Sequence, residues 1–298
     1  MVAAGIGPQN WREPETVALP DDFLPAYPTL VRQLVWRRGH RQPAEALQFL
    51  NPLEFRLPPP GTYTSLAVAA DRVDVAINTQ EQIWVWGDFD ADGQTSTAVL
   101  VGALRKLGTR VSYFIPNRLT ESHGLKAPQL DSIVEAGCRV LITCDCGTND
   151  AAVVDYANSK GLDVIITDHH QQTGPIPRAV AVCNSSHFSP ADPLNGAPGV
   201  AMAYLLVREL FERRSRGQDV QQELDLVALG IIADLAPGSP ANRAFLARGL
   251  PRLWREPRPG VRALLKLIGV PSETLETLKI SFKLAPLLNA AGRLADAR

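Results

Sequence analysis

The chain has 298 residues, of which 45% are hydrophobic and 20% are charged, and its formal net charge at pH 7 is −1. This composition predicts a globular protein with a sizeable apolar core, and the length predicts a large domain with an accessory part. No apolar run is long enough to span a membrane, and the N-terminus has no signal-peptide pattern. The near-neutral charge gives no support from composition to a nucleic-acid partner.

The cysteines predict reduced thiols in a cytoplasmic protein. Three of the four lie in or just after apolar, strand-like runs, and no Cys-x-x-Cys pair occurs. Disulfides and a zinc site are therefore not expected. The four are Cys138, Cys144, Cys146 and Cys183.

Residues 1–60 are rich in proline and predict a helical N-terminal arm. Apolar spacing indicates helices over 24–36 and 43–50. A basic cluster follows the first of these helices. It could contact phosphates, although a solvated helix end is the more ordinary explanation. The cluster consists of Arg37, Arg38, His40 and Arg41.

From residue 61 to 240, strands alternate with helices. This pattern predicts an α/β domain with a mainly parallel sheet and helices on both faces. A helical segment, residues 241–298, follows it. The predicted strands are 83–87, 111–115, 139–143, 164–167 and 179–183. The predicted helices are 67–80, which precedes the first strand, and 95–107, 129–136 and 151–160, which lie between strands.

Three aspartates at alternate positions follow the first predicted strand. They are Asp88, Asp90 and Asp92, in a predicted strand-to-helix turn. Carboxylates this close repel one another, and they stay ionised together most easily around a cation. A solvated acidic turn is the alternative. An EF-hand loop is excluded because its twelfth position would be Val99 instead of glutamate and because a strand precedes it.

Polar residues also follow other predicted strands. Asp145 comes after strand 139–143, and Asp168, His169 and His170 come after strand 164–167. The carboxyl ends of parallel strands line one edge of the sheet, so these side chains and Asp88 are expected to meet there. A lone His-His pair is more often a surface feature. Its place directly after a buried strand favours a site here.

These motifs resemble those of the DHH phosphoesterases. The matching stretches are 87–93, 145–147 and 168–170, although Cys146 stands where asparagine is usual. Within the superfamily the chain is similar to the RecJ family of single-strand-specific 5′-to-3′ DNA exonucleases, which implies a role in DNA repair and recombination. The stretches that carry this narrower resemblance are 49–52, 115–118 with 124–125, 196–201, 228–230 with 233–234, and 288–293.

The resemblance implies a set of site residues and a cofactor. Two divalent ions about 4 Å apart suit phosphodiester hydrolysis, and histidine ligands favour Mn²⁺ over Mg²⁺. His170 would contact the scissile phosphate, and Asp168 would orient its neighbour or bind metal. Arg118 and Arg293 would hold phosphates of the strand. The implied metal ligands are Asp88, Asp90, Asp92, Asp145, His169 and Asp234.

The resemblance also implies a monomer that acts on single-stranded DNA, with a single-strand-binding protein or a helicase as partners. It implies a further C-terminal domain, so weak activity is expected of this chain alone. Two other functions stay open. One is a phosphodiesterase on short oligonucleotides or cyclic dinucleotides. The other is a non-catalytic replication scaffold, which the retained acidic and histidine residues disfavour.

Overall fold

The computed structural model describes residues 15–271 and 276–294. Residues 1–14 of the predicted arm, and 272–275 and 295–298 of the predicted helical segment, lie outside the described residues. Contacts divide the chain into two compact units between Asn51 and Pro52. No helix among the described residues is both long and apolar enough to cross a membrane.

The first unit is helical, as predicted. It contains α1 (Thr29–Arg37) and α2 (Pro43–Leu50), and Phe23 lies in a small apolar core with residues of both helices. The first helix starts later than residue 24, because Leu24 has a left-handed backbone with φ 50° and Pro28 directly precedes the helix. Pro43 suits the first position of α2, where no backbone donor is needed.

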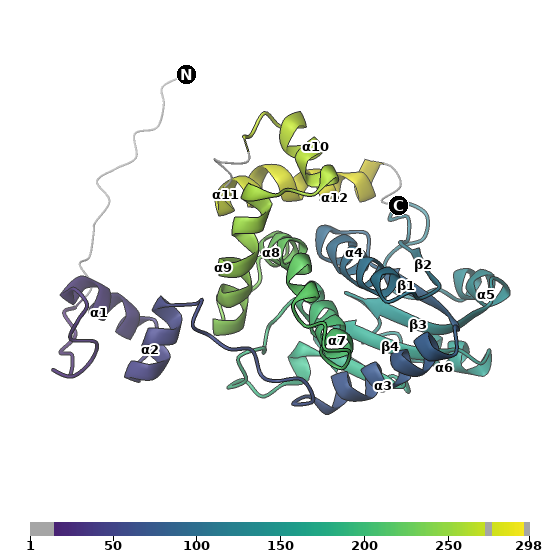
Figure 1. Cartoon of the computed structure of the whole chain (residues 1–298), viewed down its shortest axis with the longest axis horizontal. Helices are drawn as coiled ribbons and strands as arrows, with labels where there is room; N and C mark the ends of the chain where they lie inside the picture. The colour runs from purple at the N-terminus through teal and green to yellow at the C-terminus, as the bar shows by residue number, and fades with distance from the viewer. Residues whose placement is uncertain (1–14, 272–275, 295–298) are drawn as a thin grey trace, which may run out of the picture. The chain divides into compact units, whose positions relative to one another are not determined.

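The second unit is built on a five-stranded sheet in the order β2-β1-β3-β4-β5 (Figure 1). Every neighbouring pair is parallel, which confirms the predicted α/β class. The fifth strand of the prediction is present. The strands are β1 (Gln82–Gly87), β2 (Val111–Phe114), β3 (Cys138–Cys144), β4 (Asp163–Asp168) and β5 (Ala181–Asn184).

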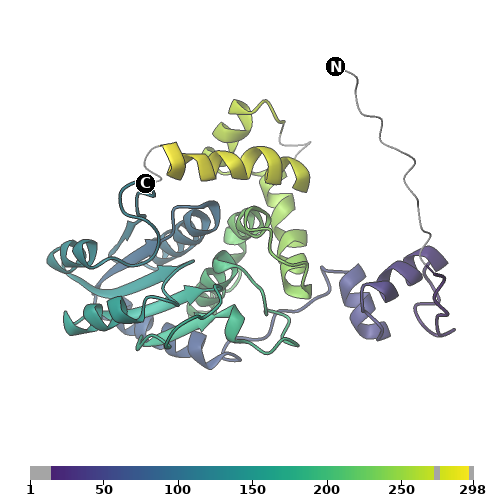
Figure 2. The ribbon, with the colours of Figure 1, turned by 180° about the vertical axis from the view of Figure 1, so that it is seen from behind.

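Helices cover both faces of the sheet, as Figures 1 and 2 show from opposite sides. One apolar core contains Ile83 and Val85 of β1, and the other contains Trp86, because successive side chains of a strand point to opposite faces. The first core takes in α3 (Thr64–Asn78), α4 (Ala91–Lys106) and α7 (Gly199–Glu212), and the second takes in α5 (Ala127–Glu135) and α6 (Ala151–Ser159). All four cysteines are buried and free, as predicted.

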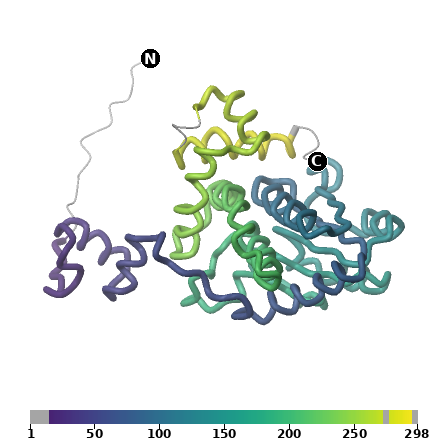
Figure 3. The backbone as a smooth tube through the Cα atoms, in the orientation of Figure 1, coloured from purple at the N-terminus to yellow at the C-terminus, as the bar shows by residue number. Residues whose placement is uncertain are grey.

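The chain after α7 is helical, and the tube in Figure 3 shows its path. A third apolar cluster joins α8 to the helices that follow it. The last helix also packs on α4. The elements are η2 (Asp219–Glu223), α8 (Leu224–Ala233), α9 (Pro240–Arg255), α10 (Pro259–Leu267), α11 (Thr277–Lys279), the π-helical turn η4 (Ile280–Leu284) and α12 (Ala285–Leu294).

The start of α4 corrects the prediction in a way that matters for the site. The helix begins at Ala91, not at residue 95, so Asp92 lies in its first turn and not in a loop. Asp90 is the N-cap, and its Oδ1 accepts a hydrogen bond from the amide of Gly93 at 3.0 Å. This bond lets the helix start within the acidic motif.

Candidate metal centre and active site

Asp92 is fixed by the beginning of another helix. It is 2% exposed, and its carboxylate accepts hydrogen bonds from the amides of Gly199 (2.7 Å) and Val200 (2.9 Å), the first two residues of α7. A helix N-terminus stabilises such an anion. Burial, and then the charges of Asp234 and Asp90, nevertheless raise the pKa of Asp92 to about 8.

Asp145 follows β3 and is 1% exposed. Its backbone is left-handed, with φ 61°, a conformation that aspartate tolerates better than most residues. Its Oδ1 atom lies 3.1 Å from Nε2 of His169, yet it forms no hydrogen bond in the part of the chain that the structure describes. Burial, and then the charge of Asp92, raise the pKa of Asp145 well above its usual value.

Asp88, directly after β1, has the same combination of burial and missing partner. Its Oδ1 atom is buried and has no hydrogen-bond partner among the described residues. Burial, followed by the charge of Asp90, raises its pKa to about 6. Two buried carboxylate oxygens without a donor are unusual in a folded protein and indicate a place for a cation.

Asp168, at the end of β4, has partners for both oxygens. Oδ1 accepts hydrogen bonds from the amides of His169 (2.7 Å) and His170 (3.2 Å) and lies 2.8 Å from Nδ1 of His170, and Oδ2 accepts from the amide of Thr148 at 3.0 Å. Burial raises its pKa, but the hydrogen bond from His170 and the bonds from Thr148 outweigh burial and hold it at about 2.

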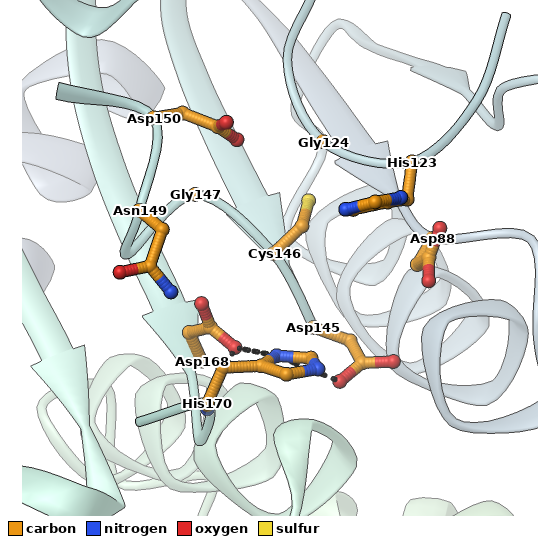
Figure 4. A pocket seen from close by; sticks show the side chains of 10 residues that line it. All are labelled: Asp88, His123, Gly124, Asp145, Cys146, Gly147, Asn149, Asp150, Asp168 and His170. Atoms are coloured by element: carbon orange, nitrogen blue, oxygen red, sulfur yellow. Dashed lines mark hydrogen bonds and ion pairs between the residues drawn. The ribbon is translucent and has the colours of Figure 1, made fainter. Parts of the chain in front are cut away.

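The pKa values of the two histidines are shifted in opposite directions. The hydrogen bond to Asp168 raises the pKa of His170 to about 9, so this ring is charged at neutral pH. Burial lowers the pKa of its neighbour His169, so this ring is neutral and free to bind a metal ion. Figure 4 shows His170 between Asp168 and Asp145.

The structure brings the six predicted ligands together in two groups of three. Within each group the donor atoms lie within 4.8 Å of one another. The short contact between Asp145 and His169 joins the groups. A further group combines these two residues with His170, whereas Asp168 belongs to no such group of described residues. The two groups are Asp88, Asp90 and Asp145, and Asp92, His169 and Asp234.

A cavity of about 180 Å³ opens beside the cluster (Figure 4). His123, Asn149 and Asp150 line it, although no sequence pattern had indicated them. His123 is close enough to Asp88 for its charge to lower the pKa of that carboxyl. Asn149 and Asp150 could have been predicted, because they are polar and follow the motif at residues 145–147 closely.

The two predicted phosphate-binding arginines lie in segments that contact the acidic turn. The exposed guanidinium of Arg118 lies 4.8 Å from the ring centroid of Phe89, between Asp88 and Asp90 in the chain. Arg293 is also exposed and belongs to α12. Their phosphate contacts stay predictions.

Helix α12 is bonded to the acidic turn. Oδ1 of Asn289 accepts a hydrogen bond from the amide of Ala91 at 2.8 Å. Nε2 of Gln94 donates to the carbonyl oxygens of Phe89 (2.7 Å) and Leu288 (3.0 Å), so it links the turn to the helix. At Gly292 a Cβ atom would lie 2.8 Å from the carbonyl oxygen of Phe89. Residues 288–293 are one of the stretches that resemble the family, but no contact of this stretch with the acidic turn was predicted.

Comparison with known proteins gives consistent matches. RecJ, the single-stranded-DNA-specific exonuclease of Bacillus subtilis, is 37% identical over 268 residues, which are 90% of this chain and 34% of the relative. RecJ of Dickeya dadantii is 36% identical over 291 residues, or 93% of this chain and 49% of the relative. The chain thus spans about a third to a half of the length of these relatives.

Solved structures agree with this match. The crystal structure of RecJ from Thermus thermophilus in complex with Mn²⁺ superposes with a TM-score of 0.75 at 30% identity, covering 90% of this chain and 38% of that one. The family model described as "DHH family, N-terminal domain" matches residues 82–231. This stretch runs from β1 into α8 and includes every member of the two donor groups except Asp234. The chain therefore belongs to the DHH family and, within it, is similar to the RecJ exonucleases.

Proposed function

We propose that this chain carries the catalytic centre of a metal-dependent exonuclease that degrades single-stranded DNA in DNA repair and recombination. The observation that supports this most strongly is the pair of donor groups joined at Asp145 and His169. The names of the similar proteins support single-stranded DNA as the substrate. The 5′-to-3′ direction rests on the family resemblance.

The donor residues fit divalent ions such as Mn²⁺ and Mg²⁺. Asp88 and Asp145 each direct a buried oxygen without a donor into the cluster, and the carboxylates raise one another's pKa. A bound cation would reverse that shift by stabilising the charged forms. Oxygen ligands with a neutral imidazole suit Mn²⁺, and solved RecJ structures hold Mn²⁺ or Mg²⁺.

We assign one ion to Asp88, Asp90 and Asp145 and the other to Asp92, His169 and Asp234. Such a pair of ions supplies an activated water and neutralises charge on the phosphoryl oxygens. The protein positions these ligands through the amides at the start of α7, which hold Asp92, and through Asp90, which caps α4. Both anchors are backbone contacts and are therefore rigid.

His170 would donate a hydrogen bond to the scissile phosphate. Its Nδ1 is held by Asp168, which leaves Nε2 for the substrate and keeps the ring protonated at neutral pH. Asp168 acts here as a positioning residue, because both of its oxygens are already bonded within the protein. The positive charge of the ring would stabilise the phosphate more strongly as negative charge develops on it in the transition state.

Arg118 and Arg293 would hold the terminal phosphate of the strand through their planar guanidinium groups. We propose a monomer that acts in the cytoplasm, with a single-strand-binding protein or a helicase supplying the strand. The four free, buried thiols suit a reducing compartment. The complete donor set disfavours a non-catalytic scaffold, because a protein without metal chemistry gains nothing from keeping these carboxylates and His169 together.

The test is digestion of end-labelled substrates with Mn²⁺, with Mg²⁺ or with EDTA. Single strands should shorten from the 5′ end in Mn²⁺, while duplexes and the EDTA samples stay intact. The Asp145→Asn variant, which keeps the side-chain volume, should be inactive. Cleavage of cyclic dinucleotides or of dinucleotides alone would instead support the short-substrate phosphodiesterase, and no cleavage of any substrate together with no Mn²⁺ binding would support a scaffold.

A further inference from the structure

A second cavity, of about 540 Å³, lies on the helical side of the second unit. This volume is typical of small-molecule sites. The cavity is lined by the segment that leads into α3, by α7 and α9, and by the residues around the start of α8. None of its lining residues lines the cavity beside the acidic cluster. Three of them are arginines: Arg56, Arg208 and Arg248.

The positive charge of these arginines is not neutralised. No carboxylate of the described residues lies within 4.0 Å of a nitrogen of any of the three, although Glu212 also lines the cavity. Elsewhere in this unit, three partly buried arginines are each paired with an acid: Arg72, Arg214 and Arg258. With Glu212 counted, the lining carries two more positive than negative charges, which favours an anion.

Two of the guanidinium groups are held in place by backbone carbonyls. Nη1 of Arg208 donates to the carbonyl of Pro58 at 2.7 Å, and Nη2 of Arg248 donates to the carbonyls of Phe55 (2.5 Å) and Leu53 (3.1 Å). A carbonyl fixes a guanidinium without cancelling its charge. The remaining donors of each group are left for a ligand, and an ordered side chain loses less entropy on binding.

From these contacts we propose that the cavity binds a phosphate group. The oxygens of a phosphate can accept from several guanidinium forks at once, whereas a carboxylate offers only two oxygens. A terminal phosphate carries a charge of about −1.5 to −2 at pH 7, which matches the excess charge of the lining. Leu57, Pro59 and Pro60 add apolar wall for the sugar or base attached to it.

The site is separate from the donor groups but lies in the same unit. Arg208 is nine residues beyond Gly199, whose amide binds Asp92, so it lies roughly 13 Å further along α7. The phosphate could belong to a DNA strand that also reaches the donor groups, or to a free nucleotide. The first source depends on the proposed function, and the second does not.

Arg56 gives a clean test, because it is exposed and its side chain makes no hydrogen bond or ion pair within the described chain. Binding of a fluorescent oligothymidylate is measured by anisotropy in EDTA, where no metal-dependent cleavage interferes. Arg56→Gln should weaken binding roughly tenfold. It should also reduce the slope of log affinity against log salt by about 0.7. The control is Arg110→Gln, an exposed arginine just before β2, which should match the wild type.

Parallel titrations with inorganic phosphate and thymidine monophosphate identify the source. The Nε–Hε resonances of the arginines should shift with whichever ligand occupies the cavity. If Arg56→Gln weakens binding of the oligonucleotide alone, the cavity holds a phosphate of a DNA strand. If it also weakens binding of the two small ligands, the cavity holds a free phosphate or nucleotide. The proposal is overturned if Arg56→Gln binds all three probes like the Arg110→Gln control. Loss of nuclease activity has no bearing on this outcome.

Discussion

Asp145 combines properties that a solvated acidic residue does not have. It is buried, its backbone is left-handed, and one carboxylate oxygen finds no hydrogen-bond donor within residues 15–271 and 276–294. Each of these costs free energy in the ion-free protein. Their coincidence at one residue, beside His169, is best explained by an ion that offsets these costs when it binds.

The first prediction concerns this ligand set. The double change Asp90→Ala and Asp145→Ala removes two of the three donors of one group. Mn²⁺ binding at that group should be lost, which titration calorimetry would record as a fall in stoichiometry. Asp155→Ala is a matched control, since the one ion pair of this partly exposed acid within the described residues is with Arg178. Unchanged stoichiometry and affinity in the double variant would refute the metal site.

The second prediction concerns the end of the strand. If Arg118 and Arg293 bind the terminal phosphate, each change to alanine should cost about 1.5–3 kcal/mol of binding free energy. The loss should appear with 5′-phosphorylated strands and shrink with 5′-hydroxyl strands. Affinity for both strands is measured in EDTA for each variant. An equal loss on the two strands would indicate general attraction to the backbone and would exclude the end-binding role.

Single residues differed in how far the sequence could predict them. That the aspartates and histidines following strands lie close together was predictable, because parallel strands deliver their carboxyl ends to one edge of the sheet. Asp234 was not, because a polar residue at a helix end is ordinary, and only the family resemblance selected it. His123 carried no signal, since its place beside Asp88 depends on how a loop folds back.

At the scale of elements, the apolar runs and their glycine and proline boundaries were sufficient to predict the strands and their order in the chain. The lateral order of the strands was not predicted, because it depends on long-range packing. The start of α4 was missed since Asp90 caps the helix from within the acidic motif. The contact of α12 with this motif was also missed, because pairing between segments so distant in the chain leaves no periodic pattern.

The third prediction follows from that contact. Asn289→Ala removes the acceptor of the amide of Ala91, a residue that is 1% exposed. An unpaired buried amide costs about 1–3 kcal/mol, and the turn that carries Asp88 and Asp90 should loosen. Mn²⁺ affinity should therefore fall, and exchange of the Ala91 amide hydrogen should become faster.

A control separates this effect from a general loss of packing. Lys283→Ala changes an exposed residue of η4, near α12 in the chain, and should leave both readouts unchanged. Asn289→Asp keeps an acceptor and should restore slow exchange at Ala91 even if its added charge alters metal binding. If Asn289→Ala binds Mn²⁺ as the wild type does, α12 has no part in positioning the ligands.

At the scale of the whole molecule, the cluster makes stability depend on pH. Asp88, with a pKa of about 6, and Asp92, with a pKa of about 8, hold protons more tightly in the folded than in the unfolded chain. The stability that each contributes is present at low pH and is lost as pH rises through its folded pKa. The pKa of His170 is raised to about 9. Its contribution to stability is therefore also lost as pH rises, from its usual pKa of 6.5 up to about 9.

Other groups oppose this trend or leave it unchanged. The lowered pKa of His169 makes stability rise with pH, but only below its usual value of 6.5. Asp168, with a pKa of about 2, contributes stability that is fully present above 3.8 and is constant near neutral pH. The carboxyl groups with raised pKa values therefore determine how stability changes with pH between about pH 5 and 8.

The fourth prediction is that, in EDTA, the free energy of unfolding falls between about pH 5 and pH 8. Each proton that is bound in the folded but not in the unfolded chain lowers the free energy of unfolding by about 1.4 kcal/mol per pH unit. Mn²⁺ binds the deprotonated carboxylates, so its stabilising effect should grow over the same range. Urea unfolding at each pH, with and without Mn²⁺, measures both trends. Asp145→Asn should flatten the fall and remove most of the Mn²⁺ effect. A stability in EDTA that rises steadily across this range would mean that these carboxylates are charged and well solvated in the folded protein, which would contradict the buried cluster on which the proposed metal centre depends.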